Sequence, residues 1–473
     1  MNSCWPKGAA ADRRAVGETA ALWDLDVAIE AAGGDEALTE ASDADLARRE
    51  AEYEKFVWDN LPRNYLGNYL HGMLGMTGFR LFNAPTFLPA YIHQVSGSNA
   101  IVGLAIALQQ VGGVISPIFT GAKVEHRTKV MPAAMWMGSL GRAAVLMVAL
   151  SGWFLKGQPL VAALLTFIFL FGVFMGAQRV VFSLLMSKVI PLSRRGRLQA
   201  WRNATGGAIA AVLAWVAGRY FIAPNLFGNG YSTTFLFGFV LTSLGLSALQ
   251  ILLKEPEPPT TRVQARVRDR FREFPKLIQQ DRSYGFFLLV QMLAVSARIA
   301  TPFYILYVTQ KLHLHGAVQM GSTLGILSTA FMLGDTFSNI GWGSLGDRTG
   351  FRLVLLLSIV TWVAATLLLM DVGHLWLIAA AFFGLGAAQA GYNMSAQTMI
   401  LEFGHRDDLP MRIAVSATAE SITATAGPLI GGWMADAFGY SLVFGASAGM
   451  LAAALLILIA AVREPRTARL AAL

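Results

Sequence analysis

Twelve stretches after residue 65 are each near or above the ~20 apolar residues that a helix needs to cross a ~30 Å hydrocarbon core. The chain is 55% hydrophobic and only 14% charged, with a mean hydropathy of +0.51, which is too apolar for a soluble globular domain. Only helices and closed barrels satisfy the backbone in lipid, and these stretches exceed the ~10 residues of a barrel strand. We therefore predict an all-α membrane protein with twelve transmembrane helices, at 66–93, 98–120, 131–151, 159–188, 201–222, 232–254, 284–310, 318–342, 353–371, 375–402, 412–437 and 440–462.

The twelve stretches form two similar halves. GAKVEHRTKV begins at Gly121 and GSLGDRTGFR at Gly343, an offset of 222 residues, and Arg80 and Arg298 are offset by 218. Matching offsets indicate a duplicated unit of six helices, so we expect two six-helix bundles related by pseudo-two-fold symmetry. The expected divisions are an N-terminal tail (1–64), a first bundle (65–254), a basic linker with an amphipathic helix (255–283), a second bundle (284–462) and a C-terminal tail (463–473).

Basic residues are concentrated on one side of the predicted spans. Twenty-three Lys and Arg residues fall in the loops on the side of the two termini, and the opposite loops contain only Lys156, Arg219 and Lys311. The positive-inside rule then predicts a protein of the inner (plasma) membrane with both termini in the cytoplasm. The acidic N-terminal tail lacks a signal-peptide pattern and contains the single cysteine, Cys4, and Ser42 with Asp45 predicts a capped helix ending near Pro62.

One loop signature resembles a known family. Gly343, Asp347, Arg348, Gly350 and Arg352 match the G-x-x-x-D-R-x-G-x-R loop of the major facilitator superfamily, and the twelve spans resemble its bacterial members. The resemblance implies a secondary active transporter in which Asp347 and Arg348 form an inner-gate latch. The first half has the related residues Gly121, Glu125 and Arg127, but it departs from the pattern with glutamate in place of aspartate and with His126 and Thr128 at two other positions.

Apart from Arg202, Arg219 and Arg412 at the ends of spans, which are counted with the loops, four arginines lie inside the predicted spans, where each would cost ~2.5–3.5 kcal/mol if it faced lipid. They are Arg80, Arg142, Arg179 and Arg298. The family resemblance implies that helices 1, 4, 7 and 10 line the central cavity. That would place three of these arginines there, as substrate-binding candidates with Asn83, Gln389 and Asn393, whereas Arg142 in the third helix is expected to be structural.

The acidic residues of the spans leave two interpretations open. Asp335 and Glu420 could pair with Arg80 or Arg298 and simply stabilise the bundle, because buried ions require partners. Alternatively, the excess of arginines binds an anionic substrate through fork-like contacts, while Asp335 or Glu420 takes up a coupling proton.

The sequence does not indicate a nucleotide-binding or a metal-binding site. There is no G-x-x-x-x-G-K-[ST] phosphate loop, and His313 with His315 provides too few ligands for zinc. We expect no cofactor, no metal, no nucleic-acid partner and no enzymatic activity. We expect instead a monomer in the lipid bilayer that moves a small organic, anionic solute by alternating access coupled to H⁺. The alternatives are a multidrug exporter of the same family and a non-transporting receptor or scaffold that acts through the acidic tail.

Overall fold

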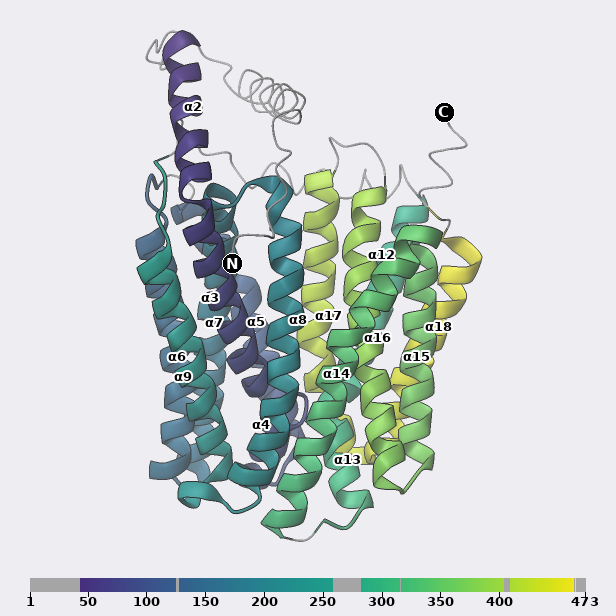
Figure 1. Ribbon diagram of the computed structural model, residues 1–473. Coiled ribbons are helices and arrows are strands. Elements are labelled where there is room, and N and C mark those ends of the chain that lie inside the picture. Colours follow the sequence, from purple (N-terminus) through teal and green to yellow (C-terminus); the bar gives the residue numbers. More distant parts are fainter. Residues whose placement is uncertain are drawn as a thin grey trace. The chain divides into compact units, whose positions relative to one another are not determined.

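The computed structural model describes residues 43–124, 127–257, 282–314, 316–403, 409–462 and 464. The regular structure of these residues is helical (Figure 1). Cys4, Glu125, the amphipathic helix expected in the linker, and the C-terminal tail apart from Glu464 lie outside the described residues. The chain divides into two compact units, 1–52 and 53–473, and both halves of the predicted repeat fall in the second unit.

The helix expected in the N-terminal tail is present as α2 (Asp43–Asp59). In its 43–52 portion, an exposed ion pair joins Arg48 and Glu52 at 3.0 Å, one helical turn apart. An exposed pair of this kind contributes only about 0.3–0.5 kcal/mol.

The first half of the 53–473 unit contains seven α-helices and two short segments of other helix type among the described residues. They are α3 (Leu61–Phe82), α4 (Phe87–Ser96), α5 (Asn99–Val124), α6 (Met131–Phe154), α7 (Gly157–Val189), α8 (Leu192–Val216), the π-helix η1 (Ala217–Ile222), the 3-10 helix η2 (Leu226–Gly228) and α9 (Gly230–Leu252).

The second half repeats this order. It comprises α12 (Arg282–Ser296), the 3-10 helix η4 (Ala297–Phe303), α13 (Tyr304–Lys311), α14 (Ala317–Thr349), α15 (Phe351–Asp371), α16 (Leu375–Glu402), α17 (Leu409–Phe438) and α18 (Tyr440–Ala461).

Ten of the described helical stretches are long and apolar enough to cross a membrane, compared with the twelve expected. The helices α3 and α17 occupy the positions of the first and eleventh expected spans but are not among the ten. Polar side chains lower the hydropathy of both helices. The polar residues include Asn64, Asn68 and His71 in α3 and Glu420 in α17.

The first helix of each half is interrupted just beyond its arginine. After Arg80, α3 ends at Phe82 and α4 begins at Phe87, with Pro85 between them. Arg298 lies in η4, which also contains Pro302. Proline removes a backbone donor and breaks the helical ladder, so equivalent proline breaks place the two arginines at equivalent bends.

Glycines allow one pair of helices in each half to pack closely. A Cβ atom at Gly172 of α7 would lie 2.1 Å from the carbonyl oxygen of Gln109 in α5. In the second half, a Cβ at Gly386 of α16 would lie 2.0 Å from the carbonyl oxygen of Phe331 in α14. Small residues permit this backbone approach, which membrane helices use for packing in the absence of a hydrophobic driving force.

The two halves are joined at one end, which we call the Asp436 end. There, Asp436 of α17 accepts hydrogen bonds from Ser98, Asn99 and Ala100 at the start of α5. The described hydrogen bonds that join the halves all involve residues between this end and the level of Arg80. The described structure therefore has its halves closed at the Asp436 end.

Candidate functional site

Arg80 and Asp335 form an ion pair between the two halves. Arg80 Nη2 lies 3.0 Å from Asp335 Oδ2, and Arg80 Nη1 donates to Thr336 Oγ1 at 2.9 Å. The side chains are 21% and 20% exposed, so the pair is neither sealed in the protein nor open to bulk solvent. This is one of the pairings required by the structural interpretation of the arginines, and it also links the two halves directly.

Arg298 has a different environment, although it occupies the equivalent position in the repeat. Its Nη2 donates to Asn393 Oδ1 at 2.8 Å, and its guanidinium carbon lies 5.1 Å from the ring centroid of Tyr392 and 6.0 Å from that of Trp362. Its Nε is buried without a hydrogen-bond partner. Arg298 forms no ion pair with any described carboxylate, so its direct partners are neutral.

Glu420 belongs to a polar network that reaches Arg298 through an aromatic side chain. The Tyr392 hydroxyl donates to Glu420 Oε1 at 3.1 Å, while the ring of Tyr392 lies beside Arg298. Gln291, which is completely buried, donates to the same carboxylate oxygen at 3.3 Å and accepts a hydrogen bond from Ser416. Arg298 thus packs on aromatic rings and bonds to an amide, while Glu420 accepts from a tyrosine and an amide. The two charges lie close to each other without a direct ion pair.

A small cavity lies beside this network. Its volume is about 10 Å³, which is room for about one water molecule, and Pro85 from the first half contributes to its wall. Two buried polar atoms of its lining residues, Thr301 Oγ1 and Trp362 Nε1, have no hydrogen-bond partner. Unpaired buried donors are costly, so these two groups are suited to bind a water molecule or one polar group of a ligand. The remaining lining residues are Tyr304, Phe331, Phe382, Leu385 and Gln389.

The other predicted substrate-binding residues are dispersed. Gln389 lines the cavity, and Asn393 binds Arg298 directly. Asn83 instead follows the end of α3, donates to the Phe79 carbonyl and accepts from Gln109 Nε2 at 2.7 Å. Arg179 is exposed and has no ion pair with a described carboxylate. The structure thus brings Arg298, Asn393 and Gln389 together, whereas the described contacts do not link Asn83 or Arg179 to them.

Arg142, which the sequence suggested to be structural, is 2% exposed. It donates to the carbonyl oxygens of Thr242 and Gly138, each at 2.7 Å, and its Nη2 lies 3.5 Å from His71 Nε2. Arg202, which is counted with the loops because it lies at the start of the predicted span 201–222, is well inside α8, which begins at Leu192. Its side chain fills the space beside Gly72.

Sequence reasoning also missed the aromatic and amide residues of the site. Tyr392, Trp362 and Gln291 contact the two candidate charges, but residues of these types are common in membrane helices. The one available signal was the position of Tyr392, which directly precedes the substrate-binding candidate Asn393.

The loop signature of the second half has a structural basis in two of its residues. Gly350 has a φ of +91°, and a Cβ there would lie 2.5 Å from the Glu464 carboxyl group. The backbone N–H of Arg352 donates to Glu464 Oε2 at 3.1 Å, and its guanidinium donates to the carbonyls of Leu458 and Ile459. These contacts join the start of α15 to the end of α18.

The remaining signature residues lie in or near α14 and α5. Gly343 lies within α14, and Asp347 and Arg348 are exposed near its end, where Arg348 forms no ion pair with a described carboxylate. In the first half, Gly121 lies in α5 and Arg127 is exposed. The described contacts therefore do not include an ion pair for the arginine of the expected latch.

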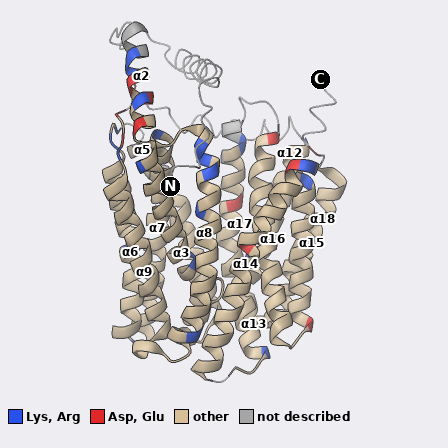
Figure 2. Cartoon of the chain, in the orientation of Figure 1, with Lys and Arg blue, Asp and Glu red and all other residues tan. Residues whose placement is uncertain are grey.

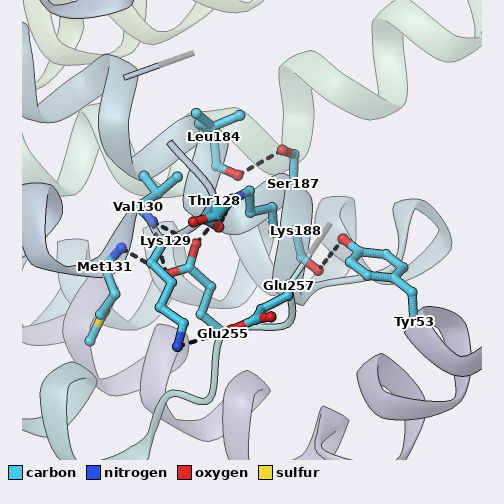
Figure 3. Close-up of polar contacts among 10 residues, drawn as sticks. All are labelled: Tyr53, Thr128, Lys129, Val130, Met131, Leu184, Ser187, Lys188, Glu255 and Glu257. Carbon is cyan, nitrogen blue, oxygen red and sulfur yellow. Dashed lines mark hydrogen bonds and ion pairs between the residues drawn. The ribbon is translucent and has the colours of Figure 1, made fainter. Parts of the chain in front are cut away.

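Glu255 is the first-half counterpart of Glu464, and both precede a proline in the sequence. Its carboxylate accepts from the backbone N–H groups of Val130 and Met131 at 2.7–3.0 Å and pairs with Lys188 Nζ at 3.1 Å (Figure 3). The Glu255 side chain is only 6% exposed. Nearby, the Tyr53 hydroxyl donates to the Lys188 carbonyl, and burial raises the pKa of Tyr53. A carboxylate at the start of a helix is stabilised by the helix dipole, so Glu255 caps α6.

The distribution of charge agrees with a membrane-spanning unit. Figure 2 shows mostly uncharged residues along the middle of the helices, and most of the Lys and Arg residues lie at the end where α12 begins. Few basic residues lie at the opposite end.

Comparison with known proteins gives consistent results. A family model described as Major Facilitator Superfamily matches residues 70–327 and 286–472. The multidrug resistance protein MdtG of Serratia proteamaculans is 31% identical over 195 residues, which is 41% of this chain and 47% of that protein. The chain thus matches about half the length of such curated relatives.

Two solved structures share the fold at low sequence identity. A mutant form of the nucleoside transporter NupG has a TM-score of 0.66 at 15% identity, covering 85% of this chain and 100% of that chain. A D-xylose-proton symporter has a TM-score of 0.60 at 14% identity, covering 85% of this chain and 97% of the symporter.

Proposed function

Because the chain belongs to the major facilitator superfamily, and is thus a membrane transporter of small molecules rather than an enzyme, we propose that it moves a small organic anion by proton-coupled alternating access. The anion preference rests on the environment of Arg298. This cation is half-buried beside a cavity, keeps a buried, unpartnered Nε, and has only neutral direct partners. A carboxylate or phosphate group would supply the missing charge.

Proton coupling is the second part of the proposal, and the Arg80–Asp335 pair supports it. The pair links the halves across 3.0 Å and retains some exposure, so a proton could reach the carboxylate. Protonation of Asp335 would remove the charge attraction that holds this contact, and the halves could then separate more easily. Glu420 is the second candidate, since its carboxylate is linked to Arg298 through Tyr392.

We also propose the arrangement of the protein in the membrane. Residues 65–254 and 284–462 form the two moving bundles, joined by a basic linker at 255–283. The positive-inside rule places the basic loops and both termini in the cytoplasm. Closure at the Asp436 end then corresponds to an inward-facing state of an inner-membrane protein that works as a monomer.

A ligand-binding assay on the purified full-length chain tests the anion proposal. The wild type is screened by thermal shift against organic anions, sugar phosphates and lipophilic cations, alongside Arg298→Gln, Arg298→Lys and the control Arg219→Gln. A ligand at 100 times its dissociation constant adds about 2.7 kcal/mol of stability. We expect anions to stabilise the wild type and the control more than Arg298→Gln, with Arg298→Lys between them.

Drug export is the second candidate, and the similarity to MdtG favours it. The cavity wall is largely aromatic, with Tyr304, Phe331, Trp362 and Phe382. If lipophilic cations stabilise the wild type and Arg298→Gln equally and anions stabilise neither, the anion proposal is wrong and drug export replaces it.

A further inference from the structure

A second, larger pocket lies at the Asp436 end, away from the central network. It has a volume of about 590 Å³, within the range of pockets that bind small organic molecules. Most of its wall comes from the first half, including Tyr91, Lys156 and Tyr231, while Gly316, Ala317 and Met320 of the second half complete it. None of its lining residues is acidic, and Lys156 is the one Lys or Arg among them.

Two long helices begin at this pocket without side-chain caps. The helix α7 starts at Gly157 after Lys156, and α14 starts at Ala317 after Gly316. Each helix has 33 residues, and neither N-terminus has a side-chain hydrogen bond that caps it. Free backbone N–H groups and the positive end of the dipole favour anions, and here two such ends meet at one pocket beside an ammonium group.

A buried hydroxyl provides independent evidence for a ligand. Tyr231 lines the pocket and is 5% exposed, yet its hydroxyl has no hydrogen-bond partner. The nearby amides are already occupied: Asn229 donates to Tyr91 and to the Gly152 carbonyl, and Asn225 Oδ1 accepts from Gly230 N. These bonds hold the pocket wall in place and leave the Tyr231 hydroxyl available.

We infer that this pocket, which we call the Lys156 pocket, binds a small anion with a carboxylate or phosphate group, through Lys156, the N-termini of α7 and α14, and the Tyr231 hydroxyl. Because α14 belongs to the second half and the other groups to the first, the bound anion bridges the halves. It therefore favours the state that is closed at the Asp436 end. The inference does not depend on Arg298 or on which solute is transported.

Equilibrium binding of inorganic phosphate and of citrate to the full-length protein tests the Lys156 pocket, with gluconate as an ionic-strength control. Lys156→Met removes the ammonium group, Tyr231→Phe removes only the hydroxyl, and Arg219→Met removes a basic residue at the same end that does not line the pocket. Hydrogen exchange of the wild type locates the bound anion without any substitution.

We expect phosphate or citrate to slow amide exchange at 157–160 and 317–320. We also expect Lys156→Met to raise the anion concentration needed for half of this protection by about tenfold or more, the effect of losing one charge-assisted hydrogen bond, and Arg219→Met and Arg298→Gln to leave that concentration unchanged. Unchanged exchange at both helix starts, or protection that Lys156→Met retains in full, would overturn the inference. Loss of binding only in Arg298→Gln would assign the anion to the central site instead.

Discussion

Replacement of Asp436 by asparagine should open the contact that closes the two halves. In the structure, both oxygens of Asp436 accept hydrogen bonds, from Ser98 Oγ, from the backbone N–H and Nδ2 of Asn99 and from the N–H of Ala100, at 2.8–3.0 Å. A residue of the second half thus caps α5 in the first half. Asparagine keeps the size of the side chain but replaces one accepting oxygen with a donor and removes the charge.

The expected cost follows from these contacts. Loss of an N-cap acceptor costs about 1 kcal/mol, and loss of a negative charge at a helix N-terminus costs about 0.3–1 kcal/mol. Asp436 is exposed, so solvent screens part of the charge term. We expect a total of about 1–2 kcal/mol, which shifts the equilibrium between closed and open at this end by about 5–30-fold.

Distances between spin labels measure this equilibrium directly. Cysteines at Gln158 in the first half and Gly373 in the second, in a Cys4→Ser background, place one label on each half at the Asp436 end. Asp371→Asn is the matched control, because Asp371 is an exposed acid at the end of α15 with no hydrogen bond or ion pair to a described residue.

We expect Asp436→Asn to increase the population with a longer distance between the labels, and Asp371→Asn to leave the distribution unchanged. If Asp436→Asn has the wild-type distribution at low ionic strength, where its charge is least screened, the capping contact does not control closure and the reasoning fails.

Three further predictions concern other contacts. Asp335→Asn mimics the protonated acid, so we expect proteoliposomes to retain substrate exchange but to lose accumulation driven by a pH gradient; an unchanged response to the gradient would exclude Asp335 as the coupling site. Glu255→Ala should lower the free energy of unfolding by about 2 kcal/mol, because it leaves buried donors unpaired. Glu257→Ala should change it by less than about 0.5 kcal/mol, since Glu257 is 72% exposed; equal effects in denaturation assays would contradict the capping role. Gly350→Ala should destabilise by about 1–2 kcal/mol, because φ is +91° and Glu464 is close, whereas Gly343→Ala should not destabilise, since its nearest neighbour is 3.9 Å away; a thermal shift that ranks them in reverse would refute this account.

Much of the fold could be predicted because a bilayer imposes strict limits on sequence. Apolar stretches of about 20 residues identify membrane helices, since the backbone has no other way to satisfy its hydrogen bonds in lipid. Apolar length predicts spans least well where a membrane helix contains polar residues. The first expected span is split at Pro85 into α3 and α4. Neither α3 nor α17 is among the ten described helices that are long and apolar enough to cross a membrane.

Helix boundaries are also hard to predict from sequence, and they decide whether a charged side chain lies in a loop or inside the bundle. The predicted span begins at residue 201, so Arg202 is expected at its edge, but α8 extends from Leu192 and carries this side chain into the bundle beside Gly72. A cluster of Arg142, Arg202 and His71 in three different helices leaves no pattern in the sequence that could be recognised.

By itself, the sequence determined the family, the helical class and the presence of Arg80 and Arg298 in apolar stretches, because these follow from local composition and one short motif. The tertiary structure alone decided their partners. At equivalent positions of the repeat, Arg80 meets the carboxylate of Asp335 in the other half, while Arg298 meets the amide of Asn393 and the ring of Tyr392 in its own half. Partner choice depends on the rotation and crossing of helices that are far apart in the chain, and these are set by packing between helices.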